Sequence, residues 1–139
     1  MRSGLEDSTV DHPNAMRMRD TVDAFLSGDM PRLLDGFTDD VVWYAPGNSR
    51  VSGTFHGRDG VARFFALMNE GSAGSMHVEI DDVLASDRFV TIFLKITAAR
   101  GGEALSAIIA QFAVPDEDGR WSRCWFLPDK LEEWNRFFA

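Results

Sequence analysis

The side chains that could carry acid–base chemistry are few and widely spaced in this sequence of 139 residues. His56 follows a short apolar stretch, and Asp129 follows the last apolar stretch of the chain. A carboxylate at a pocket rim, assisted by an imidazole or an amide, can move a proton without a cofactor. We therefore take Asp129 and His56 as candidate catalytic residues, with Gln111 as a possible helper. A turn histidine and a helix-capping aspartate are the structural alternatives for the first two.

Other chemistries find little support in the sequence. The histidines at 12, 56 and 77 are far apart, and no Cys or His stands at ligand spacing from them, so we predict no metal and no cofactor. The glycine-rich stretch "GTFHGRDG" lacks the Lys-Ser/Thr signature of a phosphate loop. Cys124 lies inside an expected strand, which favours a small core or pocket residue over a nucleophile.

Composition indicates a folded protein with an acidic surface. The apolar fraction is 45%, with 11 Phe and 4 Trp, which is enough for a substantial core. A net charge of -8 opposes binding to phosphate backbones and anionic lipid, so we expect neither nucleic acid nor membrane as a partner. The acidic N-terminus does not resemble a signal peptide, no apolar run is long enough to span a bilayer, and there is one cysteine. These features predict a cytoplasmic protein.

Hydrophobic periodicity predicts the order helix, short helix, strand, strand, helix and then four strands. We expect a disordered tail over residues 1–11 and a single domain over residues 12–139. Apolar residues at helical spacing predict a helix near 13–27 that Asp11 or Asn14 caps, and another near 58–71 that Asp59 caps. A short helix over 30–35, capped by Asp29, lies between the first helix and the strands. Alternating or β-branched stretches predict strands near 41–45, 51–55, 76–85, 88–99, 104–114 and 120–127.

This order predicts an α+β fold, in which a curved, mainly antiparallel sheet wraps around the N-terminal helices. In the stretch "VVWYAPG", Val41, Trp43 and Ala45 share one face of a strand, and we expect that face to look at the helices. Such a cone tends to leave an apolar pocket, although a fully packed core is the alternative. The expected ligand-binding residues are Phe25, Trp43, Ala45, Phe64, Met68, Ala110, Phe112, Cys124 and Phe126.

Three stretches resemble a known superfamily. They are "AFLSGDMPRLLDGFTDDVVWYAPG", "SGTFHGRDGVARFF" and "DGRWSRCWFLPD". The chain resembles the nuclear transport factor 2-like superfamily, in its SnoaL-like and ketosteroid-isomerase-related branch, from about residue 12 to about residue 135. The resemblance implies a cone-shaped, cystatin-like α+β roll with a deep pocket, and a homodimer that forms through the sheet.

The resemblance carries activity only residue by residue. The tyrosine and the two aspartates of ketosteroid isomerases correspond to Thr21, Ala45 and Ala110 here, so the resemblance does not imply steroid isomerisation. The Arg-x-Asp pair of limonene-epoxide-hydrolase-like members is also absent from the late strands. Asp129 is the nearest match to the acid–base aspartate of SnoaL-like polyketide cyclases.

Two hypotheses of different class follow. In the first, the protein has an apolar pocket that binds a small, cyclic, hydrophobic molecule. The protein then acts as an enzyme of the isomerase, cyclase or lyase type, which catalyses cofactor-free cyclisation, isomerisation or dehydration. In the second, the domain is a non-catalytic module for ligand binding, dimerisation or interaction. The ending "WNRFFA", residues 134–139, is then either a docking element or a flap that covers the sheet.

Overall fold

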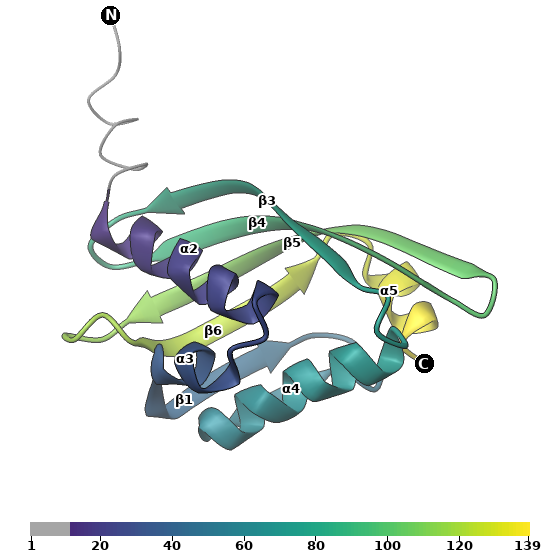
Figure 1. Cartoon of the computed structure of the whole chain (residues 1–139), viewed down its shortest axis with the longest axis horizontal. Helices are drawn as coiled ribbons and strands as arrows, with labels where there is room; N and C mark the ends of the chain where they lie inside the picture. The colour runs from purple at the N-terminus through teal and green to yellow at the C-terminus, as the bar shows by residue number, and fades with distance from the viewer. Residues whose placement is uncertain (1–11) are drawn as a thin grey trace, which may run out of the picture.

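A computed structural model describes residues 12–139, and the disordered tail expected over residues 1–11 lies outside that range. Two helices open the described part of the chain, two strands and a third helix follow, and four further strands lead to a short final helix (Figure 1). The elements are α2 (Pro13–Leu26), α3 (Met30–Asp35), β1 (Phe37–Ala45), β2 (Gly53–His56), α4 (Gly57–Gly71), β3 (His77–Ala85), β4 (Val90–Arg100), β5 (Glu103–Pro115), β6 (Trp121–Pro128) and α5 (Leu131–Phe137).

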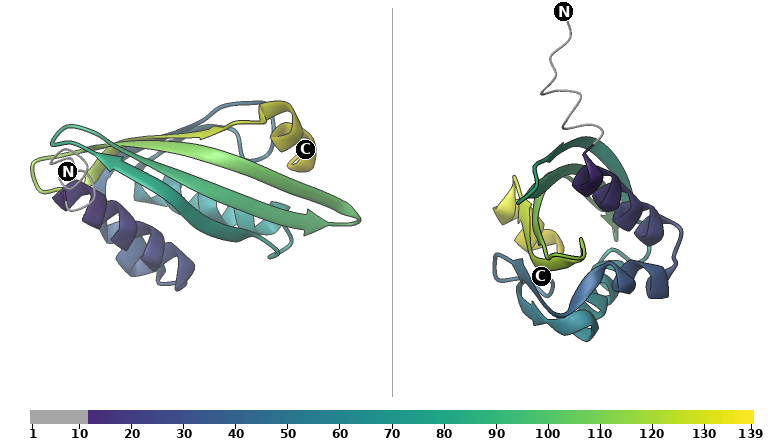
Figure 2. Two further views of the ribbon diagram at one scale, coloured as in Figure 1. Left: turned by 90° about the horizontal axis from the view of Figure 1, so that it is seen from above. Right: turned by 90° about the vertical axis from the view of Figure 1, so that its left-hand side faces the viewer.

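The strands form one six-stranded sheet in the order β2-β1-β6-β5-β4-β3. Only β1 and β6 pair in parallel, and all other neighbours are antiparallel. Figure 2 shows that the sheet curls, with α2, α3 and α4 on its concave side. The expected α+β fold, a curved and mainly antiparallel sheet around the helices, is confirmed.

Local sequence signals set the ends of the first two helices. Pro13 occupies the first turn of α2, where a missing N–H costs nothing. The cap of this helix is His12, whose Nδ1 accepts from the Asn14 backbone N–H at 3.1 Å, so the expectation that Asn14 caps it was wrong. The alternative, Asp11, lies outside the described residues. Asp29 caps α3 as predicted, because its Oδ1 accepts from the backbone N–H of Arg32 at 3.2 Å.

The start of α4 differs from the sequence prediction. Asp59 was expected to cap this helix, but it lies in the first turn, and the N-cap position belongs to His56. The His56 side chain makes no capping hydrogen bond. Asp59 is still favourable there, since a carboxylate in the first turn complements the helix dipole.

The concave face of the sheet carries the core. In β1, the side chains of Val41, Trp43 and Ala45 are buried, as the alternation predicted, and the Tyr44 ring stacks outside on Trp125 at a centroid distance of 5.5 Å. Trp43 forms the centre of an aromatic cluster, with ring centroids 4.9–6.1 Å away. The other rings of that cluster are those of Phe37, Phe64, Phe65 and Phe126.

Helix α5 folds the C-terminal residues back onto the sheet. Its Trp134 and Phe137 are buried, as is Phe138 just after it. Arg100 holds this end in place, because its guanidinium donates to the Gly71 carbonyl at 2.5 Å and to the Phe137 carbonyl at 2.6 Å. The stretch 134–139 is therefore a packed flap. It is not an exposed docking element, because its aromatic rings are buried.

Candidate ligand-binding site

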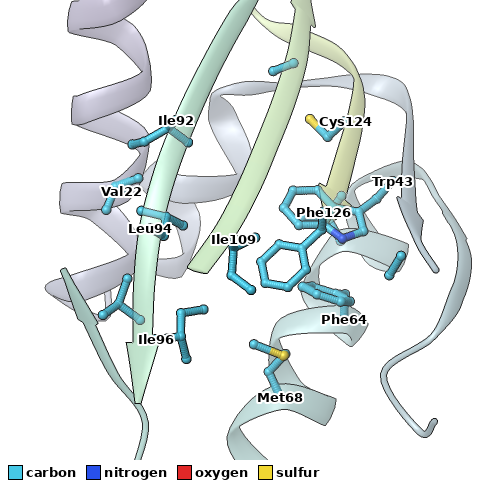
Figure 3. Packing of buried hydrophobic residues seen from close by; sticks show 14 of the residues in the cluster. Val22, Trp43, Phe64, Met68, Ile92, Leu94, Ile96, Ile109, Cys124 and Phe126 are labelled. Atoms are coloured by element: carbon cyan, nitrogen blue, oxygen red, sulfur yellow. The ribbon is translucent and has the colours of Figure 1, made fainter. Parts of the chain in front are cut away.

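A small apolar cavity of about 30 Å³ lies between the helices and the concave face of the sheet. That volume would hold one or two water molecules. Of the thirteen residues that line it, eleven are apolar. Figure 3 shows how this interior is built: Phe64 and Met68 of α4 point toward Phe126, while Leu94 and Ile96 point inward from β4.

An outer cleft of about 400 Å³ adjoins the cavity, between α2, the start of α3, α4 and β3. The side chains of Phe25 and Phe65 border both spaces, and their rings lie 5.0 Å apart between centroids. Leu33 and Met76 are also shared. Cavity and cleft are thus two sides of one apolar wall, and a ligand larger than a few waters has to displace these rings.

Only two polar side chains line the cavity, and neither of them titrates. The Thr21 hydroxyl already has two partners, because it donates to the Arg17 carbonyl at 2.9 Å and accepts from Trp121 Nε1 at 2.9 Å. The second is Gln111, which is 6% exposed and reaches only Met18, with Nε2 4.0 Å from Sδ. The cavity therefore offers an apolar surface and one amide with spare hydrogen-bonding capacity.

Several of the residues expected to form the pocket lie in or directly behind its wall. Phe25, Met68 and Phe126 line the cavity. Trp43 and Phe64 stand one layer behind, with Trp43 5.9 Å from Phe126 and Phe64 5.1 Å from Phe126 between ring centroids.

Cys124 and Ala45 do not reach the cavity. Cys124 is fully buried in the core, and this burial raises the pKa of its thiol far above the ordinary value, which opposes a role as a thiolate nucleophile. Ala45 lies at the end of β1 and borders a surface groove beside Tyr44 and Trp125.

Ala110 and Phe112 were expected to line the pocket, and the register of β5 shows that this expectation was wrong. Gln111 pairs with Ile92 of β4 and with Phe126 of β6, and all three are buried on the concave face. Because side chains alternate along a strand, Ala110 and Phe112 point to the outer face, where Phe112 is 39% exposed. The inward position that had been assigned to Ala110 by resemblance therefore belongs to its neighbour Gln111.

The structure does not bring Asp129 and His56 together. Both side chains are exposed, and neither lines the cavity. His56 pairs with Val42, which pairs with Arg123, whereas Asp129 comes six residues after Arg123. At the rise of a β-strand this separates them by about 20 Å along the sheet.

Asp129 has a structural partner instead. Its Oδ1 accepts from the Ile108 backbone N–H at 2.9 Å, and its own N–H donates to the Ile108 carbonyl at 2.9 Å. The carboxylate thus continues the β5–β6 ladder past Pro128, and it does not cap α5, whose N-cap is Lys130.

The sequence patterns did not identify the part of the cavity wall that β3 and β4 contribute. Val78, Leu94 and Ile96 line the cavity, as does Phe65 of α4. The strands "FVTIFLKITAA" and "ALSAIIAQFAV" are apolar on both faces, so alternation alone does not indicate which face turns inward. The available signal was Gln111, a lone amide within an apolar stretch.

Residues 12–139 contain no group of three His, Cys, Asp or Glu side chains close enough to hold a metal ion. The side chains that line the cavity include none that is ionisable.

Comparison with known proteins gives consistent matches over most of the chain. The family model described as SnoaL-like domain matches residues 18–124. Rv0034 of Mycobacterium tuberculosis H37Rv, an uncharacterized protein, is 33% identical over 89 residues, which are 63% of this chain and 68% of that protein.

Solved structures match over 91% of this chain. Bal32a, from a soil-derived mobile gene cassette, is 29% identical with a TM-score of 0.84, and 96% of that chain is covered. TerC, co-crystallized with polyporic acid, shares the fold at 20% identity with a TM-score of 0.77, and 99% of that chain is covered.

Proposed function

The chain belongs to the SnoaL-like domain family, within the nuclear transport factor 2-like superfamily, and we propose that it binds a small, cyclic, apolar molecule between its helices and its curved sheet. The observation that carries this proposal is the cavity with eleven apolar lining residues, separated from an apolar outer cleft only by side chains such as Phe25 and Phe65. TerC, a protein of the same fold, was co-crystallized with polyporic acid, and this supports the proposal.

Binding without catalysis is the form of this function that the geometry favours. Cofactor-free cyclisation, isomerisation or dehydration requires an acid or base within hydrogen-bond reach of the reacting atoms. The side chains that line the cavity offer none, and Asp129 and His56 lie outside it. An enzyme of the isomerase, cyclase or lyase type would therefore need a different site from the one described.

The first experiment is a thermal-shift and calorimetric screen of the purified protein against cyclic ketones, phenols and epoxides. A ligand present at 100 times its Kd is expected to raise the free energy of unfolding by about 2.7 kcal/mol. Asp129→Asn and His56→Gln should bind the same ligand with unchanged affinity and leave it chemically intact, as does the unmodified protein.

Two results would contradict this proposal. Failure of every apolar ring compound to bind would remove the binding function. Turnover that Asp129→Asn or His56→Gln abolishes would instead restore the enzymatic hypothesis and these residues as its catalytic groups.

We also propose that two copies of the chain pair through the outer face of the sheet. Phe112 pairs with Trp125 across β5 and β6, and Trp125 pairs with Tyr44 across β6 and β1. One row along, Ala110 lies between Phe93 and Leu127. Together these side chains form an apolar surface over four strands, and Phe112 and Leu127 are 39% and 36% exposed within it. Continuous exposed apolar surface of this kind supports an interface.

Phe112→Asp is expected to convert the dimer into a monomer, because the interface would then bury an unpaired carboxylate. Sedimentation velocity of the variant and of the unmodified protein measures this directly. Asn48→Asp adds the same charge at an exposed loop position and should remain dimeric. A monomer for the unmodified protein, or a dimer for Phe112→Asp, would contradict the assignment of this face.

We propose a cytoplasmic location for the protein, because its one cysteine is free and buried in the core, as a reducing compartment permits. None of the helices within residues 12–139 is long and apolar enough to cross a membrane.

A further inference from the structure

Gln111 occupies an unusual place for an amide. It lies in the middle of the concave face, between Ile92 on β4 and Phe126 on β6, with Met18 of α2 facing it. Its flanking inward neighbours on β5, Ile109 and Ala113, are fully buried. Every other side chain at this level of the face is apolar, so packing alone would favour a leucine or methionine at position 111.

The carboxamide of Gln111 has hydrogen-bonding capacity that the described residues use only in part. It carries two N–H donors and a carbonyl oxygen that accepts two hydrogen bonds. Within residues 12–139 the side chain makes one hydrogen bond, in which Nε2 donates to the Met18 thioether sulfur at 4.0 Å. A thioether sulfur is a weak acceptor. Burying an amide without partners destabilises a fold, and a ligand oxygen or hydroxyl group in the cavity would complete its hydrogen bonds.

The other residues of the cavity lining indicate whether the site accepts a charged ligand. The cavity lining has no Arg, Lys or His to pair with an anion and no carboxylate to pair with a cation. The Thr21 hydroxyl is already occupied by Arg17 and Trp121. A charged ligand would lose its hydration here and gain no counter-charge, which is strongly unfavourable in an apolar site.

We propose that Gln111 makes this site selective for neutral apolar ring compounds that carry a hydrogen-bonding oxygen, and that the site rejects carboxylates. The inference rests on the proposed binding function and adds the substrate class to it. Nε2 donates to a ketone or ether oxygen, or the carboxamide oxygen accepts from a hydroxyl group. The ring occupies the cavity and the space that Phe25 and Phe65 now fill.

The test uses three naphthalene probes of equal ring size: naphthalene, 2-naphthol and 2-naphthoate. Their Kd values are measured at pH 7 by fluorescence titration with the unmodified protein and with Gln111→Leu. Loss of one neutral hydrogen bond should lower the affinity for 2-naphthol relative to naphthalene by about fivefold in Gln111→Leu. The melting temperature of Gln111→Leu should rise or stay constant, since an unsatisfied amide is replaced by an apolar side chain of similar volume.

Ile109→Leu, on the same strand and face, is the matched control, and its ratio of 2-naphthol to naphthalene affinity should equal that of the unmodified protein. An unchanged ratio in Gln111→Leu, with both probes still bound, would overturn the inference while leaving the proposed function intact. Preferential binding of 2-naphthoate would also overturn it. Failure of all three probes to bind would remove the proposed function, and this inference with it.

Discussion

Removal of residues 134–139 is expected to abolish the cooperative thermal unfolding of the protein. The deleted segment contains Trp134, Phe137 and Phe138, all of which are buried. Truncating one buried aromatic side chain costs about 3–5 kcal/mol, and the whole free energy of unfolding of a domain is about 5–15 kcal/mol. Losing three together therefore consumes most or all of the stability, and near-ultraviolet circular dichroism during heating measures the loss.

The segment is tied to three other parts of the chain, so its loss exposes more than its own surface. The Phe138 carbonyl accepts from the backbone N–H of Arg50 at 3.1 Å, and the Phe137 carbonyl accepts from Arg100. The Phe138 ring lies so close to Gly71 that a Cβ at that glycine would stand 2.7 Å from Cδ1. The end of α4, the loop after β1 and the β4 strand all lose a partner.

Single substitutions separate packing from chain length in this experiment. Trp134→Ala should lower the free energy of unfolding by about 3–5 kcal/mol. Glu132→Gln, on the exposed side of the same helix, should change it by less than about 0.5 kcal/mol. A truncated protein that melts like the full chain and loses only a binding partner would restore the docking hypothesis.

Met68→Ala is expected to cost about 2–5 kcal/mol of stability and to enlarge the ligand site at the same time. Met68 is buried in α4 and lines the cavity. Its truncation adds the volume of the lost side chain to a space that already exists, and a dry apolar cavity of sufficient size binds small aromatic hydrocarbons. Urea unfolding with and without saturating toluene measures both effects, because a ligand that binds the native state restores stability.

Ile92→Ala is the matched control for this rescue. Ile92 is fully buried on the same concave face but does not line the cavity. We expect a comparable loss of stability with a much smaller recovery in toluene. An equal recovery of stability in both variants would mean that toluene binds in any cavity created in the core. If toluene restored no stability to Met68→Ala, the proposed location of the site would be contradicted.

The sequence alone determined those parts of the fold that depend on neighbouring residues. The short helix Met30–Asp35 and its Asp29 cap were predicted as the structure has them, because a cap and a helical turn are local interactions. The inward face of β1 was also predicted, since Trp43 alternates with the outward-facing Tyr44. The order of helices and strands followed from the change in hydrophobic period near residue 76.

Only the tertiary structure decided which residues form the site. Strand β5 is apolar on both faces, so its register with β4 and β6 decides which of its side chains point inward. That register places Gln111 on the concave face, where Phe112 was expected from the sequence. Asp129 looked catalytic in sequence because its partner, the backbone N–H of Ile108, is distant along the chain. The cavity itself is the space left where a curved sheet meets three helices, and its size is set by how these surfaces pack, which no local pattern encodes.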